Sequence, residues 1–428
     1  MTEMAAVYRP IHEAETFVQT DIGLLPTSWR VSSLGEIATV SAGGTPSRNV
    51  PSYWDGGIPW ITTAEVDSSN IDRATQSITL DGLKNSAAKL LNPGTLLLAL
   101  YGQGKTRGKV GLLQIAAATN QACAAIELDR GHSSAFVFHF LRAQYENIRK
   151  LSNIGNQENL SGAIVRSIKI PLPARSEQQA IAEALSDADA LIESLALLLT
   201  KRRQIKQGAM QNLLTGRKRL AGFNDSWPQP TLGELFDFKN GLNKAKAFFG
   251  HGTPIVNYMD VFSAPALFSE KLVGRVSVVA DELRNYDVRK GDVFFTRTSE
   301  TTNEIGLSSV MVDEAVNAVF SGFVLRARPR DKRLNSRFAV YALRSECVRA
   351  QIVARASYTT RALINGRLLG AARVPMPQPR EQEALAEILE DMDAGILAVE
   401  GKLDKALQLK TAMMQALLTG RIRLVRPL

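Results

Sequence analysis

Residues 170–220 read IPLPARSEQQAIAEALSDADALIESLALLLTKRRQIKQGAMQNLLTGRKRL, and residues 374–424 read VPMPQPREQEALAEILEDMDAGILAVEGKLDKALQLKTAMMQALLTGRIRL. The two stretches align without a gap at an offset of 204 residues, and about 25 of the 51 positions are identical. Solenoid repeats are about 20–50 residues long, so a period of this length indicates a duplicated half-protein instead. The sequence therefore predicts two copies of one long segment, with other structure between them.

The duplication continues more faintly upstream of each copy. Segment 28–36 has Ser-Trp followed by Leu-Gly-Glu, and segment 226–234 has the same residues at the same spacing. The rest of the two intervening segments shares almost nothing. Strand-like runs at 95–100, 293–296 and 322–326, together with helical patterns at 135–151 and 336–355, predict two α+β modules of similar topology. We expect an N-terminal arm (1–22), a first module (23–169), a central helical spacer (170–220), a second module (221–373) and a C-terminal helical spacer (374–428).

Each spacer carries a heptad pattern of apolar residues over about 38 residues without proline. This pattern predicts a coiled-coil seam, with Lys206 and Lys410 as polar residues on it. Each helix would be about 55 Å long at 1.5 Å per residue. Antiparallel pairing is the natural arrangement within one chain, and it would give a pseudo-twofold molecule with a module at each end. The predicted seam residues are Ile181, Leu185, Ile192, Leu195, Leu199, Leu385, Leu389, Met392, Ile396, Val399 and Leu403.

Composition excludes several classes of protein. Two cysteines rule out a disulfide scaffold, and four scattered histidines argue against a dedicated zinc site. The longest apolar runs are far shorter than the roughly 20 residues that cross a bilayer, and the N-terminus is too acidic for a signal peptide. We therefore expect a cytoplasmic protein without membrane contact. The net charge of +9 is compatible with a polyanionic partner, but alone it decides little.

Motifs for catalysis or cofactor binding are missing from the sequence. Residues 99–106 (ALYGQGKT) fit a relaxed phosphate-loop pattern, yet residues 107–113 (RGKVGLL) read as a turn and a strand rather than as a helix. There is no dinucleotide fingerprint, no Asn-Pro-Pro-Tyr or Asp-Pro-Pro-Tyr segment of an amino-methyltransferase, and no cluster of metal ligands. We expect no catalytic residue, no metal site and no cofactor bound by this chain.

The repeated motifs of the modules and spacers, in their order along the chain, resemble those of the specificity subunit of a type I restriction–modification system. The resemblance covers the chain after about residue 22. Its strongest carriers are the duplicated Pro-x-Pro, Glu-Gln and Leu-Leu-Thr-Gly motifs of the spacers. The GGTPS loop at 43–47 and the segment NIGNQENL at 153–160 add to it. The second module departs from the pattern, with GLNK at 241–244 and a poor match at 359–365.

The resemblance implies a non-catalytic DNA-binding subunit. Each module would be a target recognition domain that reads one half of a split, asymmetric site in double-stranded DNA. The helices would set the spacing and dock two methyltransferase subunits, and two restriction subunits can join that core. S-adenosylmethionine, ATP and Mg would belong to these partner subunits.

Basic and polar side chains in the loops of each module are the candidates for DNA contacts, because phosphates attract cations and base edges accept hydrogen bonds. For any one of them, a solvated surface charge is the alternative reading. The candidates are Arg48, Lys105, Arg107 and Asn159 in the first module, and Lys244, Arg297 and Arg361 in the second.

Two other function classes are weighed against this reading. A stand-alone restriction or methylation enzyme would need catalytic motifs outside the two modules, where no room remains. A coiled-coil interaction scaffold would show no affinity for duplex DNA in any complex.

Overall fold

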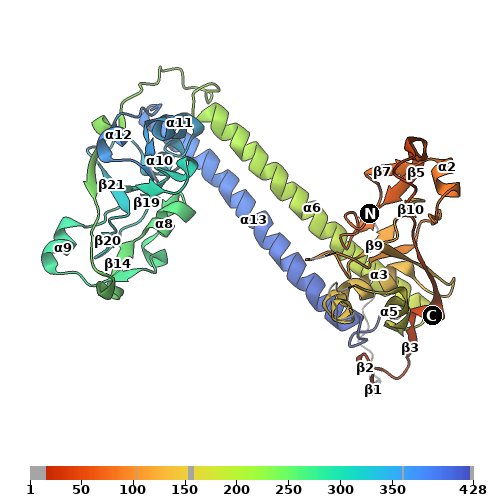
Figure 1. The fold of residues 1–428 in the computed structure, drawn as a ribbon. Helices are drawn as coiled ribbons and strands as arrows, with labels where there is room; N and C mark the ends of the chain where they lie inside the picture. The colour runs from red at the N-terminus through yellow and green to blue at the C-terminus, as the bar shows by residue number, and fades with distance from the viewer. Residues whose placement is uncertain (1–15, 103, 153–158, 359–360, 425–428) are drawn as a thin grey trace. The chain divides into compact units, whose positions relative to one another are not determined.

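The computed structural model describes residues 16–102, 104–152, 159–358 and 361–424. The chain divides into two compact units (Figure 1). Unit 1 comprises Met1–Ala196 and Lys402–Leu428, and unit 2 comprises Leu197–Gly401. The predicted N-terminal arm lies mostly outside the described residues. Its last part forms β1 (Phe17–Thr20), which pairs antiparallel with β2 (Gly23–Pro26).

A five-stranded sheet forms the centre of unit 1. Its strand order is β4–β11–β8–β9–β6, and the neighbours are antiparallel except for the parallel pair β6 and β9. The central strands are buried on both faces, so they are apolar at every position instead of alternating. The strand bounds are β4 (Ala38–Ala42), β6 (Asn70–Ile71), β8 (Leu96–Ala99), β9 (Val110–Leu113) and β11 (Cys123–Leu128).

A second, three-stranded sheet of unit 1 has the order β10–β5–β7, with β10 parallel to β5 and β7 antiparallel to it. The strands β3 and β12 form a separate antiparallel pair beside the start of the long helix α6. The remaining bounds in unit 1 are β3 (Arg30–Ser33), α1 (Leu34–Ile37), β5 (Trp54–Ile61), β7 (Gln76–Ile78), α2 (Leu80–Lys84), β10 (Ala118–Thr119), α5 (Gly162–Ser167) and β12 (Lys169–Leu172).

Unit 2 repeats this topology with different residues. Its five-stranded sheet has the order β13–β21–β17–β19–β15, with only β15 and β19 parallel, and its three-stranded sheet has the order β16–β14–β20. Strand for strand, this is the arrangement of unit 1, so the prediction of two α+β modules of similar topology is confirmed. The bounds are β13 (Phe236–Asn240), β14 (Phe249–Val256), β15 (Ala266–Leu267), β16 (Arg275–Val276), β17 (Val293–Thr296), β19 (Ser308–Met311), β20 (Val319–Phe320) and β21 (Val324–Pro329).

Short elements complete unit 2. The strands β18, β23 and β22 form a further small sheet, and α7 opens with a capping box in which Glu234 accepts from the backbone nitrogen of Thr231. In unit 1, α1 opens in the same way with Ser33 and Glu36. The bounds are α7 (Leu232–Leu235), α8 (Tyr258–Ser263), α9 (Ala280–Asn285), β18 (Thr298–Ser299), β22 (Ser357–Tyr358), β23 (Ala362–Leu363) and α12 (Gly366–Gly370).

The helical segment near the end of each module is broken in two. The sequence predicts one helix over 135–151 and one over 336–355. The structure instead has α3 (Ser134–Ala143) followed by α4 (Tyr145–Lys150), and α10 (Ser336–Ala342) followed by α11 (Glu346–Arg355). The single-helix prediction is wrong because the backbone leaves the helical conformation at Ser345 and at Gln144, and the hydroxyl of Ser345 donates to the carbonyl of Ala342 over 2.6 Å.

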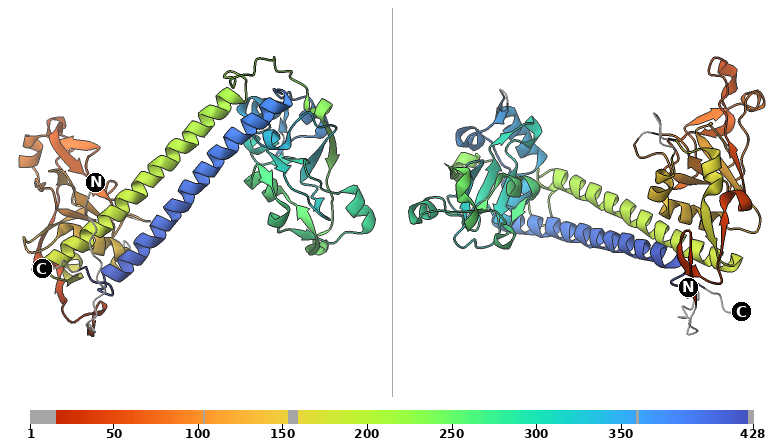
Figure 2. Two further views of the ribbon diagram at one scale, coloured as in Figure 1. Left: turned by 180° about the vertical axis from the view of Figure 1, so that it is seen from behind. Right: turned by 60° about the horizontal axis from the view of Figure 1, so that its bottom comes forward.

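The two spacers form long, uninterrupted helices, α6 (Arg175–Leu213) and α13 (Pro379–Leu417), of 39 residues each. Both views of Figure 2 show them side by side. In unit 1 Glu177 pairs with Arg423 and Asp189 pairs with Lys410, so the two helices run antiparallel. The α+β prediction with two long antiparallel helices is confirmed.

The ends of the long helices complete the core of each module. In unit 1, Ile181 and Leu185 of α6 join one apolar cluster with Leu417 of α13. In unit 2, Leu213 of α6 joins a cluster with Leu385 of α13. Each module therefore packs on the start of one helix and the end of the other. No helix in the described parts of the chain is long and apolar enough to cross a membrane.

Candidate functional site

The predicted helix-pairing seam lies on the inner faces of the long helices. None of the eleven apolar residues predicted for it is exposed, in agreement with an apolar contact line. Seven are buried, namely Ile181, Leu185, Leu199, Leu385, Leu389, Ile396 and Val399. The other four are half-buried, namely Ile192, Leu195, Met392 and Leu403.

A second heptad pattern runs along the outside of each helix, and we call it the outer stripe. Seven of its ten positions are identical between the two copies. Of the ten seam positions, which are 181, 185, 188, 192, 195, 199, 202, 206, 209 and 213 with their counterparts 204 residues on, only five are identical. Nearly all outer-stripe residues are exposed in both copies. The stripe of the first copy follows α6 and ends just after it; the stripe of the second follows α13 in the same way, from Glu387 to Thr419. The residues of the first copy are Glu183, Asp187, Ala190, Ser194, Leu197, Lys201, Gln204, Gly208, Gln211 and Thr215.

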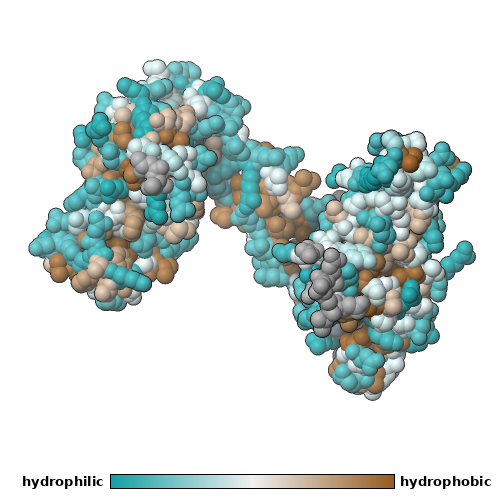
Figure 3. Space-filling model, in the orientation of Figure 1, coloured by the Kyte–Doolittle hydropathy of each residue, from teal (hydrophilic) through white to brown (hydrophobic). Residues whose placement is uncertain are grey.

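Burial within the chain does not explain the repetition of the outer stripe, because nearly all of its residues are exposed. Substitutions at exposed helix positions usually change stability by less than about 0.5 kcal/mol, so folding alone does not hold these residues constant. Other exposed apolar side chains lie on the same helices, and Figure 3 shows apolar surface there. They include Leu191, Leu198, Ile205, Leu407 and Leu409.

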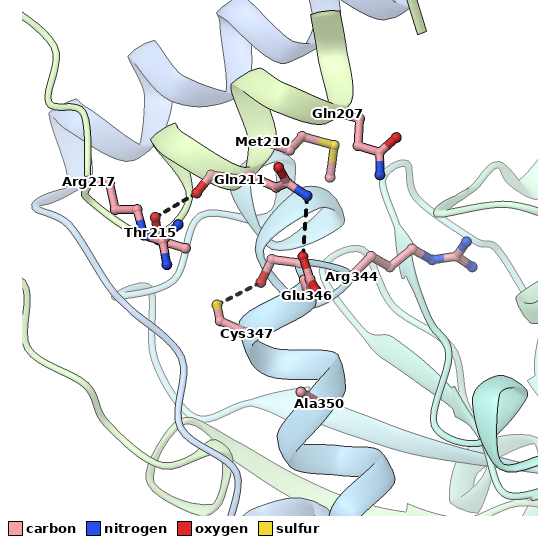
Figure 4. Close-up of a pocket in the computed structure, with 10 residues that line it drawn as sticks. Gln207, Met210, Gln211, Thr215, Arg217, Arg344, Glu346, Cys347 and Ala350 are labelled. Carbon is pink, nitrogen blue, oxygen red and sulfur yellow. Dashed lines mark hydrogen bonds between the residues drawn. The ribbon is translucent and has the colours of Figure 1, made fainter. Parts of the chain in front are cut away.

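A groove lies beside the end of each long helix, and the helix side of the two grooves is built from equivalent positions. In unit 2 the groove runs between α6 and the start of α11, where Met210, Gln211 and Thr215 face Ser345 and Cys347 (Figure 4). The side-chain amide of Gln211 donates to Glu346 over 3.3 Å across this groove.

The groove in unit 1 uses the equivalent positions of α13. It is lined by Met414, Gln415 and Thr419, together with Phe140 of α3 and Leu25 of β2. The methionine, glutamine and threonine are therefore repeated at both grooves, whereas the module side of each groove differs.

Ion pairs tie each long helix to the chain that follows the other helix. The guanidinium of Arg423 donates to both oxygens of Glu177 at 2.6 and 2.7 Å, and that of Arg219 donates to both oxygens of Glu381 at 2.8 Å. The side chains of Glu177 and Glu381 are almost fully buried. Because a buried carboxylate without its partner is costly, these pairs hold the start of each long helix against the segment that follows the other.

Sequence reasoning did not find these two pairs, although a signal was present. Glu177 and Glu381 are identical in the repeat, as are Arg219 and Arg423. The residue types alone do not show which of them meet.

The first module holds its candidate DNA-contacting residues in different surroundings. Arg48 is exposed, its guanidinium carbon lies 3.5 Å from the ring centre of Trp54, and it donates to Gln76 over 2.6 Å. Lys105 is exposed on the loop after β8. Arg107 lies in the same loop but is only 6% exposed, so the structure favours Lys105 over Arg107 as a surface contact.

The fourth candidate, Asn159, is half-buried. Most of the segment NIGNQENL, residues 153–158, lies outside the described residues. Residues 104–108 form a turn that leads into β9, as predicted, and therefore do not open a phosphate-binding helix.

In the second module, Lys244 follows β13 as Arg48 follows β4. Its ammonium nitrogen lies 4.7 Å from the ring centre of Phe248 and pairs with Glu282 at 2.6 Å. Both modules thus place a cation on an aromatic ring after the first strand of the sheet. Arg297 is half-buried after β17, and Arg361 is exposed with Glu300 at 4.0 Å.

The glycine that precedes each of these two loops is required by a close approach. A β-carbon at Gly43 would lie 2.2 Å from the carbonyl oxygen of Thr119, and one at Gly241 would lie 2.1 Å from that of Ser321. Any larger residue would push the loop off the sheet. This explains why a glycine occurs at both positions although the following residues differ.

Neither a metal site nor a catalytic constellation is found among the residues that the structure describes. No group of three or more His, Cys, Asp or Glu side chains there could hold a metal ion. The free cysteine Cys123 is buried, and burial raises the pKa of its thiol to about 12. It is therefore not a reactive thiolate.

Comparison with known proteins defines the class. Residues 26–205 match the family model described as "Type I restriction modification DNA specificity domain", and they belong to that family. The chain is 25% identical over 317 residues to the MjaIX specificity subunit of Methanocaldococcus jannaschii, covering 69% of this chain and 72% of that protein. It is 20% identical over 426 residues to the MjaVIII specificity subunit of the same organism, covering 96% and 97%.

A solved structure shares the fold. The type I restriction–modification S subunit from Mycoplasma genitalium matches with a TM-score of 0.56 at 16% identity, over 91% of this chain and 96% of that one. The predictions of a specificity subunit and of a non-catalytic DNA-recognition role are confirmed: residues 26–205 carry the DNA specificity domain, and the relatives that the chain matches over most of its length are specificity subunits of type I restriction enzymes. These relatives give no support to the enzyme or scaffold alternatives.

Proposed function

We propose that this chain reads a split, asymmetric site in double-stranded DNA, with one half-sequence recognised by each module. The observation that carries the proposal is the pair of modules with one topology and unlike loops. A shared topology presents loops at equivalent places, and unlike side chains on those loops read unlike bases. Two unlike half-sequences follow from two unlike modules.

The long helices set the distance between the half-sequences in this proposal. Each has 39 residues, or about 58 Å at 1.5 Å per residue. DNA rises 3.4 Å per base pair, so a helix of this length corresponds to roughly 17 base pairs. That scale fits two half-sequences separated by a gap of several base pairs.

The partners in this proposal are two copies of one methyltransferase subunit, which restriction subunits can join. The repeated outer stripe and the two equivalent grooves support the number two, because a surface repeated within one chain suits two copies of the same partner. Heptad spacing on the stripe suits a helix of the partner. The exposed apolar residues on the long helices suit burial in such a complex.

Catalysis and its cofactors belong to those partners. S-adenosylmethionine would bind the methyltransferase subunits, and ATP with Mg the restriction subunits. The complex would act in the cytoplasm, where cellular DNA is accessible.

Sequencing of modified bases in host DNA, with this gene intact and deleted, tests the proposal. We expect one split motif, methylated in each half, to disappear on deletion and to return when the gene is restored. A wild-type complex that assembles with its methyltransferase but leaves no split motif methylated would contradict the proposal.

A further inference from the structure

Each unit contains a three-way polar contact that sequence reasoning did not find. In unit 1, Asp189 of α6 accepts two hydrogen bonds from the guanidinium of Arg142, at 2.8 and 3.0 Å, and also pairs with Lys410 of α13. Arg142 lies on α3, which belongs to the recognition module. One carboxylate therefore joins the module to both long helices.

The same contact is built in unit 2 from other residues. Asp393 of α13 pairs with Lys206 of α6 and accepts a hydrogen bond from the hydroxyl of Tyr341 over 2.8 Å. Tyr341 lies on α10, the counterpart of α3. The ammonium nitrogen of Lys206 also lies 5.2 Å from the centre of the Tyr341 ring.

The helix side of the contact is constant, and the module side varies. Asp189 and Asp393 are related by the 204-residue offset, and so are Lys206 and Lys410. The module supplies an arginine in one unit and a tyrosine in the other. A repeated acceptor that is met by unlike donors indicates selection for the connection itself rather than for one pair of side chains.

The lysine side chains of these two contacts are largely buried. The side chain of Lys410 is 8% exposed and that of Lys206 is 20% exposed, so neither ammonium is freely hydrated. Burial lowers the pKa of Lys410 and the pairing with Asp189 raises it, with burial the larger effect. Apolar packing between a module and the helices is tolerant of small rotations, whereas a charge-assisted hydrogen bond is not.

We propose that Asp189 and Asp393 are specificity-determining positioning residues that hold each recognition module at one orientation on the helix pair. By fixing that orientation, they fix the number of base pairs between the two half-sequences. This inference rests on the proposed function, since it takes the split site as given.

Variants that remove only the module side of the contact test the inference. Arg142→Met and Tyr341→Phe each leave the ion pair between the long helices in place. The matched control is Arg203→Met, which removes an exposed ion pair to Glu400 that joins the same two helices without touching a module. Each variant is purified as the complex with its methyltransferase subunits, and cooperative thermal unfolding is recorded first.

Binding is then measured to duplexes with the native gap and with gaps one base pair shorter or longer. We expect the combined Arg142→Met and Tyr341→Phe complex to keep both half-sequences but to lose about tenfold in its preference for the native gap. The Arg203→Met complex should keep that preference. If Arg142→Met impairs folding, Tyr341→Phe is tested alone, because it removes only one hydroxyl. We then expect a smaller loss of the preference for the native gap.

Two results would overturn the inference. One is a folded variant complex that prefers the native gap as strongly as the wild type. The other is a variant complex whose affinity falls by the same factor for every gap length, because a purely structural role would have that effect. A wild-type complex that binds no split site would instead refute the proposed function.

Discussion

Lengthening both long helices by one heptad should widen the gap between the half-sequences without changing either of them. The insertions belong after Ala196 in α6 and after Gly401 in α13, where the two units divide. Ion pairs place these points opposite each other, because Arg203 meets Glu400 and Asp189 meets Lys410. A seven-residue insertion preserves the heptad, so the seam stays apolar on both sides.

The magnitude follows from helix geometry. Seven residues add about 10.5 Å at 1.5 Å per residue, and this equals about three base pairs at 3.4 Å each. Four residues added in the same way, within the 186–199 region of α6 and opposite it in α13, add about 6 Å and should widen the gap by one or two base pairs.

Methylome sequencing of cells that carry each insertion gives the gap directly. An insertion in α6 alone is the control, because it leaves seam residues of α13 without partners and should lower the yield of folded complex. An unchanged gap in the matched seven-residue variant would refute the view that helix length sets the spacing.

Three further predictions concern single residues. Lys105→Ala should weaken binding of the complex to all DNA sequences alike, and salt titration should show that the slope of log affinity against log salt falls by about one. If the variant instead loses its preference for one particular base, Lys105 reads that base and does not contact a phosphate. Burial lowers the pKa of His139 on α3 from 6.5 to about 4, so the unfolded chain binds a proton there that the folded chain does not. The contribution of His139 to the unfolding free energy should fall by about 3 kcal/mol as pH drops from 7 to 4, so denaturant titrations should show that the wild type loses this much more stability over that range than His139→Gln does. If His139→Gln keeps the full pH dependence, another group causes it. Gly241→Ala should lower the melting temperature of the complex by several degrees, because the new β-carbon would lie 2.1 Å from a backbone oxygen. Gly401→Ala is the control, because its β-carbon meets nothing within 4 Å; equal melting temperatures of the two variants would contradict the close approach at Gly241.

The long helices could be predicted because their pattern is local. A heptad of apolar residues, a proline entry and a terminal glycine all lie within one stretch of sequence, and the duplication doubles the signal. The order of the strands could not be predicted in this way. Strands such as Leu96–Ala99 are buried at every position and lack alternation, so nothing in the sequence says which neighbours they pair with.

The contacts of Asp189 and Asp393 with the modules could not be predicted either, because they join residues that are far apart in the sequence. Lys206 and Lys410 stood out as polar residues on an apolar seam, but their partners lie elsewhere in the sequence. The module side uses Arg142 in one half and Tyr341 in the other, so the repeat gives no common residue type to search for. Charge alone was also a weak guide to DNA contacts, since Arg107 is buried while Lys105, two residues earlier, is exposed.

The central claim is that each module reads its own half-sequence, and a chain with two copies of the first module tests it most directly. Residues 221–373 are replaced by residues 23–169, which the shared topology and the repeated helix ends allow. Because the helices are antiparallel, the methylated motif should become an inverted repeat of the first half-sequence with its gap unchanged. Persistence of the second half-sequence in the methylome of these cells would contradict the claim.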